Sequence, residues 1–156
     1  MKEISNYWVK DFNWKKHEAQ INKFPNFTTT VDDIEMHFIH EKGSGSNPTP
    51  LLLMHGWPGS VVEFLHIIDQ LAHPEKFGGK EEDAFDVVVP SLPGFGFSGR
   101  PKRPIGPRKM ASIFNSLMTN VLGYKKYIAQ GISVANPIKY RQTIMDSVIN
   151  LLLSLE

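Results

Sequence analysis

The chain consists of short apolar runs that end in glycine or proline, separated by stretches with apolar residues at helical spacing. Short apolar runs bounded by turn residues are typical of buried strands. Apolar residues that recur every three or four positions are typical of helices that cover a core. We therefore predict strands at 35–40, 51–54, 85–89 and 124–130, and helices at 6–23, 60–72, 110–122 and from 137 onward. This alternation favours an α/β fold whose parallel sheet is covered by helices.

Several predicted helices carry end signals in the sequence. Ser60 and Glu63 have the spacing of a capping box, in which the serine side chain accepts an amide proton and the glutamate reaches back. Pro25 and Pro74 end the helices that precede them, because a proline disfavours helical backbone in the residue before it. Gly123 stands where a helix ends in a left-handed residue.

Composition is that of a soluble globular protein with one core. The 156 residues are 41% hydrophobic and 21% charged, and a net charge of +1 provides no strong field for nucleic acid. Without cysteine, disulfides and thiolate metal sites are excluded. His37 and His40 lie three apart on a predicted strand and should face opposite sides, so we expect no metal site. No run approaches the roughly 20 apolar residues of a membrane helix, and no signal-peptide pattern is visible, so we expect a cytoplasmic location.

The segment His55-Gly56-Trp57-Pro58, which follows the predicted strand 51–54, is the first candidate for chemistry. In open α/β sheets, ligands bind where loops leave the carboxyl ends of strands. Gly56 lets the backbone turn sharply, and Pro58 fixes the exit without donating a hydrogen bond. The Trp57 N–H is then free to point into a cleft, as an oxyanion-hole donor must. The alternative is an ordinary connection between a strand and a helix.

Two further motifs are weaker. Gly94, Gly96 and Gly99 match the dinucleotide-binding spacing, but two prolines follow where that motif needs a helix, so we expect no such cofactor. The segment 131–135 follows a predicted strand and resembles a relaxed nucleophile elbow around Ser133. All six histidines lie at or before His73, whereas the hydrolase order places the base after the nucleophile. A serine esterase is therefore only our third hypothesis.

Five ordered, widely spaced segments carry a family signature between Trp8 and Gly131. They are WKKHEAQINKFPNF at 14–27, MHFIH at 36–40, HGWPGSVVEF at 55–64, PSLPGFGFS at 90–98 and LGYKKYIAQG at 122–131. Together they resemble the microsomal-type and juvenile-hormone-type epoxide hydrolases of the α/β-hydrolase superfamily. The resemblance implies the N-terminal part of an α/β-hydrolase fold, with a helical lead-in and an incomplete, mostly parallel sheet flanked by helices.

The resemblance also implies a division into three parts and a reaction. Residues 1–48 would be the epoxide-hydrolase N-terminal region (lead-in helix and first strand), 49–131 a truncated core, and 132–156 a helical tail outside the family. The family adds water to an epoxide and gives a vicinal diol, without a metal or organic cofactor. An aspartate at the elbow attacks, cap tyrosines protonate the epoxide oxygen, and a histidine oriented by an acidic residue activates water.

By resemblance, the sites fall in the loop after the strand 51–54. The backbone N–H of Trp57 would belong to the oxyanion hole, and His55, Gly56 and Pro58 would line the substrate site. The substrate would be a small apolar epoxide.

The chain departs from the family at Ser133, which stands where the family has the nucleophilic aspartate. From Ile132 onward we find no resemblance, and the cap, the acidic residue and the terminal histidine are absent. Such an abrupt change favours the hypothesis of a frame change, a retained intron or a truncated gene model. We expect the isolated chain to be inactive and to self-associate through an open sheet edge. The alternative is a non-catalytic protein of this lineage that binds an apolar ligand or pairs with a full-length relative.

Overall fold

Two apolar runs form the parallel centre of a five-stranded sheet. The computed structural model describes residues 1–131, so Ser133 and the helix predicted from 137 lie outside the described residues. The strands are β1 (Asn26–Val31), β2 (Ile34–Glu41), β3 (Thr49–Met54), β4 (Phe85–Pro90) and β5 (Ile128–Gly131). The helical segments are α1 (Lys2–Lys10), α2 (Trp14–Ile21), η1 (Val61–Phe64), α3 (Ile68–Ala72), η2 (Pro74–Phe77), η3 (Glu81–Asp83), α4 (Pro107–Ser116) and η4 (Leu117–Val121).

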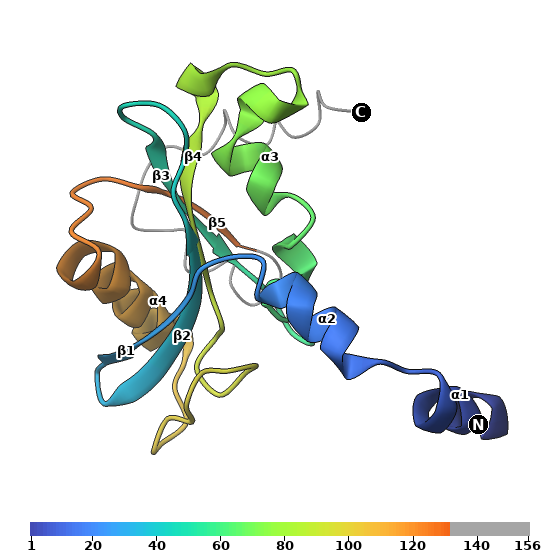
Figure 1. The fold of residues 1–156 in the computed structure, drawn as a ribbon. Coiled ribbons are helices and arrows are strands. Elements are labelled where there is room, and N and C mark those ends of the chain that lie inside the picture. Colours follow the sequence, from blue (N-terminus) through green and yellow to red (C-terminus); the bar gives the residue numbers. More distant parts are fainter. Residues whose placement is uncertain (132–156) are drawn as a thin grey trace.

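The sheet is mixed, with the strand order β1-β2-β4-β3-β5. β3 pairs in parallel with β4 and with β5, whereas β2 pairs antiparallel with both β1 and β4. The expected α/β architecture with flanking helices is confirmed (Figure 1). The parallel arrangement, however, is confined to β4, β3 and β5, and the N-terminal hairpin adds an antiparallel half.

β1 is a strand that the apolar pattern does not predict. Its centre is Thr28, Thr29 and Thr30, so it lacks the apolar run by which the other strands are recognised. Asp32 and Asp33 connect it to β2 with positive φ angles of 50° and 61°. Two consecutive left-handed residues match the twist of a two-residue hairpin. The turn thus sets the β1–β2 register.

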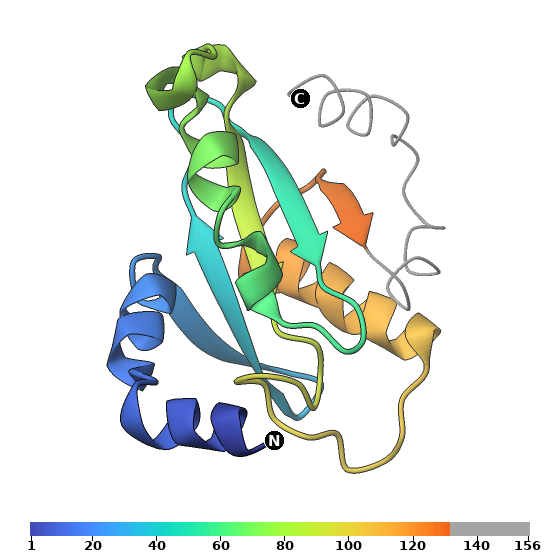
Figure 2. The same cartoon turned by 90° about the vertical axis from the view of Figure 1, so that its right-hand side faces the viewer.

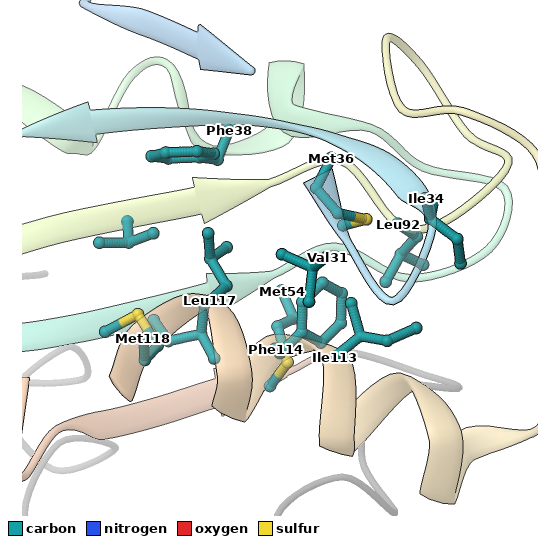
Figure 3. Packing of buried hydrophobic residues seen from close by; sticks show 12 residues of the cluster. Val31, Ile34, Met36, Phe38, Met54, Leu92, Ile113, Phe114, Leu117 and Met118 are labelled. Carbon is teal, nitrogen blue, oxygen red and sulfur yellow. The ribbon is translucent and has the colours of Figure 1, made fainter. Parts of the chain in front are cut away.

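Alternate residues of the central strands face two separate apolar layers. On one face, Leu52, Met54 and Val88 pack against α4 and η4, whose buried residues are Ile113, Phe114, Leu117 and Met118 (Figure 3). On the other face, Leu51, Leu53, Val87 and Val89 pack against η1 and α3, through Val61, Phe64, Ile68, Leu71 and Ala72. Each valine, leucine, isoleucine, phenylalanine or methionine among them contributes about 1.5–3 kcal/mol by leaving water. Burial on both faces explains why these strands are continuous apolar runs.

The helices are more interrupted than their periodicity predicts. The segment 6–23 forms two helices instead of one, and α1 buries none of its residues and lies away from the sheet (Figure 1). The segment 60–72 divides into η1 and α3, and the third helix begins earlier than expected, at Pro107, and continues as the wider turn η4. Gly123 follows it with a φ of 78°, as predicted. None of the helices within residues 1–131 is long and apolar enough to cross a membrane.

A polar cluster holds the opposite end of the sheet from the one where the parallel strands finish. The Tyr124 hydroxyl donates to Asp86 Oδ2 at 2.6 Å, and Lys42 Nζ donates to the same carboxylate oxygen at 2.9 Å and to Tyr124 at 2.7 Å. The Gly43 N–H donates to Asp86 Oδ1 at 2.9 Å. Burial opposes ionisation of Asp86, but these hydrogen bonds outweigh it and lower its pKa. The cluster ties the segment that leads into β5 to β4 and to the end of β2.

We predict that Tyr124→Phe lowers the free energy of unfolding by about 1–2 kcal/mol, because it removes a hydrogen bond to a buried carboxylate. Asp86 keeps two other donors, which limits the loss. Urea unfolding followed by circular dichroism measures the change. The matched control is Tyr7→Phe, because the Tyr7 ring is half exposed and its hydroxyl has no hydrogen bond within residues 1–131. Equal stability of the two variants would contradict the prediction.

Candidate active site

The candidate site lies at the edge of the sheet where the parallel strands end. β3 is parallel to β4 and to β5, so these three strands end at the same edge of the sheet (Figure 2). Met54 and Gly131 are partners in the register. Ligands bind at such edges in open α/β sheets. Ser133, expected at the elbow, lies outside the described residues, so its role stays a prediction.

His55 is completely buried and joins the two loops of this edge. Its Nε2 accepts a hydrogen bond from the Leu92 N–H at 3.0 Å, and its Nδ1 lies 2.9 Å from the Gly56 carbonyl oxygen. Because a backbone amide can only donate, Nε2 carries no proton, and Nδ1 therefore carries one and donates it to Gly56. With both ring nitrogens engaged, His55 orders the backbone, and the substrate contact expected for it stays a prediction.

The segment from Gly56 to Gly59 is a tight turn with Trp57 at its tip. The Gly56 carbonyl also accepts the Gly59 N–H at 2.9 Å. This carbonyl and the Trp57 N–H belong to one planar peptide unit, so holding the oxygen aims the N–H in the opposite direction. Within residues 1–131 the Trp57 N–H has no hydrogen-bond partner, and its side chain is 67% exposed. Gly56 is buried and Pro58 is exposed.

The predicted capping box fixes the exit of this turn and is confirmed. The Ser60 N–H donates to Glu63 Oε1 at 3.1 Å, and Ser60 Oγ accepts the Val62 N–H at 3.3 Å. A Cβ at Gly59 would collide with Glu63 Oε1, so a larger residue there would displace the carboxylate that caps Ser60. The turn is therefore held at its start by His55 and at its end by this cap.

The loop after β4 folds back onto β2. The Ser91 N–H donates to the His37 carbonyl at 2.9 Å, and the Gly99 N–H donates to the β2 backbone at 2.7 Å. Gly96 has a φ of 51°, and a Cβ there would lie 2.9 Å from Ser91 Oγ. Gly99 does not begin a helix, because α4 begins at Pro107. These residues therefore do not form the helix N-terminus on which a dinucleotide pyrophosphate would bind.

Sequence reasoning missed a buried polar group beneath this loop. The His37 imidazole lies 2.9 Å from Ser91 Oγ and 2.9 Å from Asn26 Oδ1. His40 contacts the Tyr124 hydroxyl at 3.0 Å on the opposite face of β2, so the predicted divergence of the two histidines is confirmed. In the part of the chain that the structure describes, no group of three or more His, Asp or Glu is placed to hold a metal ion. The sequence feature that could have indicated this buried group is His37 itself, a polar residue between the apolar residues Met36 and Phe38 of a predicted strand.

Burial controls the protonation of both histidines at this edge. It lowers the pKa of His37 and of His55 below the ordinary value of 6.5. For His55, the Gly56 carbonyl and the charge of Glu63 act in the opposite direction but with smaller effect. Neutral imidazoles agree with the hydrogen-bond pattern, because each ring accepts one hydrogen bond and donates one.

Comparison with known proteins shows which protein family this chain resembles. Residues 1–64 match the family model "Epoxide hydrolase N terminus", and residues 49–135 match the "alpha/beta hydrolase fold" model. Epoxide hydrolase 1 of Oryctolagus cuniculus is 40% identical over 136 residues, which are 84% of this chain and 30% of that protein.

Solved structures agree with these sequence matches. Aspergillus niger epoxide hydrolase superposes with a TM-score of 0.77 at 32% identity, over 88% of this chain and 36% of that one. Juvenile hormone epoxide hydrolase from Bombyx mori gives 0.75 at 32% identity, over 86% and 32%. The chain thus spans about a third of the length of the proteins that it matches.

We predict that the folded chain loses stability as the pH falls below about 6.5. His37, His40 and His55 have folded-state pKa values below 6.5. As the pH falls, these side chains therefore bind protons in the unfolded state first. Their contribution to the free energy of unfolding is complete above about pH 6.5. It is lost as the pH falls from there through their pKa values in the folded state. Each unit of depression corresponds to about 1.4 kcal/mol.

Urea unfolding at a series of pH values measures this dependence. His37→Asn should reduce the slope of stability against pH, because it removes one of the three groups. His66→Asn, the same substitution at an exposed position, is the matched control. A free energy of unfolding that stays constant or rises on acidification would contradict the prediction.

Proposed function

Because this chain belongs to the epoxide hydrolases of the microsomal and juvenile-hormone type, in the α/β-hydrolase superfamily, we propose that residues 49–131 carry the oxyanion-binding part of an epoxide hydrolase site. The reaction adds water to a small apolar epoxide and gives a vicinal diol. Residues 1–48 act as the N-terminal region that packs on this core, and 132–156 form a tail outside the family. The single observation that supports the proposal best is the Trp57 N–H at the carboxyl end of β3, which has no hydrogen-bond partner among residues 1–131.

The Trp57 amide is suited to negative charge that develops on the carbonyl oxygen of a covalent ester intermediate. Covalent epoxide opening gives an ester, and hydrolysis of that ester places negative charge on its carbonyl oxygen. A backbone donor that is already oriented needs no reorganisation when this charge forms. His55 and Gly59 hold the Gly56 carbonyl and thereby orient the amide. One such donor is worth about 10²–10³ in kcat.

We propose that the isolated 156-residue polypeptide does not turn over epoxides. Ser133 replaces the carboxylate that would attack the epoxide, and no histidine follows it in this sequence. His55 is no substitute base, because both its nitrogens are engaged and buried. Loss of nucleophile and base together leaves only binding and the oxyanion donor, a small residual activity.

The test of inactivity is an assay of the purified 156-residue chain with styrene oxide and stilbene oxide. We expect diol formation at the rate of the uncatalysed reaction. Turnover that Ser133→Ala abolishes would overturn this part of the proposal. Labelling of Ser133 by a fluorophosphonate probe would point instead to a serine esterase.

The test of the oxyanion role uses a chimera. Residues 1–131 replace the matching segment of the Bombyx mori enzyme, assayed with an epoxide that the unmodified enzyme hydrates. We expect diol formation, and we expect Trp57→Pro, which deletes the backbone N–H, to lower kcat by about 10²–10³. Trp57→Phe, which keeps the N–H, is the matched control and should retain kcat within about tenfold of the chimera. Equal kcat in the two variants would exclude the amide as donor.

A further inference from the structure

A partly buried chain of hydrogen bonds runs from the end of α2 to the loop after β4. Asn26 Nδ2 donates to the carbonyls of Ile21 and Phe24 at 3.1 and 2.8 Å. Asn26 Oδ1 lies 2.9 Å from His37 Nε2, and His37 Nδ1 lies 2.9 Å from Ser91 Oγ. Three side chains from β1, β2 and the loop after β4 therefore form one continuous path.

The direction of every bond in this path follows from its first member. The Asn26 amide nitrogen is committed to two carbonyls, so its oxygen must face His37, and His37 Nε2 must donate. In a neutral ring the other nitrogen then accepts, so the Ser91 hydroxyl donates to Nδ1. Only one neutral tautomer of His37 therefore fits both partners.

The path continues through the backbone to the proposed oxyanion donor. Leu92, the residue after Ser91, donates its N–H to His55 Nε2. His55 in turn donates to the Gly56 carbonyl, which shares its peptide unit with the Trp57 N–H. Fixing the position of Ser91 therefore fixes the group that holds His55, and through it the direction of the Trp57 amide.

Ser98 adds a second tie between His37 and the same loop. Its hydroxyl donates to the Ser91 carbonyl at 2.8 Å and accepts the His37 N–H at 3.0 Å. The Phe97 ring packs edge-on against the His37 imidazole at 5.0 Å. Both the backbone and the side chain of His37 thus hold the loop.

Solvent cannot replace the central contact of this path. Ser91 is 0% exposed and His37 is 4% exposed. Within residues 1–131 every buried side-chain polar atom has a hydrogen-bond partner. A change that removes the acceptor beside Ser91 leaves a buried hydroxyl unpaired, and the loop must move to satisfy it.

We propose that His37 is a positioning residue for the oxyanion donor, acting on the Trp57 amide through Ser91, the Leu92 amide and His55. The inference rests on the proposed role of the Trp57 amide. It gives the N-terminal region a task in the site besides covering the core, because Asn26 and His37 both belong to residues 1–48. The residue touches no reacting atom and works only through the loop geometry.

Two substitutions at His37 separate its two ring nitrogens. His37→Asn places an oxygen near the position of Nδ1 and keeps an acceptor for Ser91. His37→Gln places its amide near the position of Nε2, so it keeps a partner for Asn26 and leaves the Ser91 hydroxyl unpaired. His66→Asn on the exposed surface is the control.

The readout is nuclear magnetic resonance of the ¹⁵N-labelled 156-residue chain. In the unmodified chain we expect His37 protonated on Nε2 and His55 on Nδ1. His37→Gln should shift the Trp57 backbone amide signal and disturb the His55 tautomer, while His37→Asn should shift the Trp57 signal less, and His66→Asn should leave both unchanged. If His37→Gln does not fold, Ser98→Ala provides the test, because Ser98 is only half-buried and its loss should shift the same signals. Unchanged Trp57 and His55 signals in a folded His37→Gln or Ser98→Ala variant would overturn the proposal.

A kinetic measurement distinguishes positioning from general support of the fold. In the chimera, His37→Gln should lower kcat roughly tenfold to hundredfold with little change in KM, since a small misplacement of a transition-state donor is costly. A change in KM with kcat unchanged would contradict a positioning role. So would a loss of kcat in His37→Gln that is no larger than the loss in His37→Asn. If the chimera itself is inactive, the proposed function fails, while the resonance signals still decide whether His37 controls the Trp57 amide.

Discussion

The hydrogen bond from the Leu92 amide to His55 Nε2 joins the two loops that leave the parallel centre of the sheet. It is completely buried, so neither partner can exchange it for water. Because it fixes the tautomer of His55, it also determines that Nδ1 donates to the Gly56 carbonyl. The direction of the Trp57 backbone amide, at the tip of the turn, depends on these two hydrogen bonds. The packed layers on both sides of the sheet hold β3 and β4 in the positions that make the bond possible.

The sequence predicts the parts of the fold in which local pattern and tertiary burial agree. β3 and β4 are recognisable because both of their faces are buried, which demands continuous apolar runs. β1 is not recognisable, since its centre consists of threonines, two of which (Thr28 and Thr30) are exposed. Its strand geometry comes from pairing with β2 and from the two-residue turn at Asp32 and Asp33. The breaks in the helices also escape prediction, because an apolar stripe at helical spacing is preserved through the turns between η1 and α3.

The candidate site also has one part that the sequence predicts and one part that only the fold reveals. The loop His55–Pro58 is recognisable in the sequence as a turn, because glycine and proline directly after a buried strand mark the point where the strand ends. The contact of His37 with Ser91 joins residues 54 positions apart, and neither residue belongs to a local motif that points to the other. A histidine in a strand is usually a packed side chain, so its partner can be identified only when the sheet order is known. The order in which β2 lies beside β4 is what brings the two together.

The register of the β2–β4 pairing decides which residue of β2 stands beside Ser91. Phe38 is the partner of Pro90, so His37 stands beside Ser91, where its carbonyl accepts the Ser91 N–H. A shift of β2 by one residue would turn His37 to the face of α4 and bring an apolar side chain to Ser91. The β1–β2 hairpin opposes such a shift, because Asp32 and Asp33 fix its length and Asn26 meets His37 only in this register. The geometry of the Trp57 amide therefore depends on a turn about 25 residues before it in the chain, which no local motif around the site encodes.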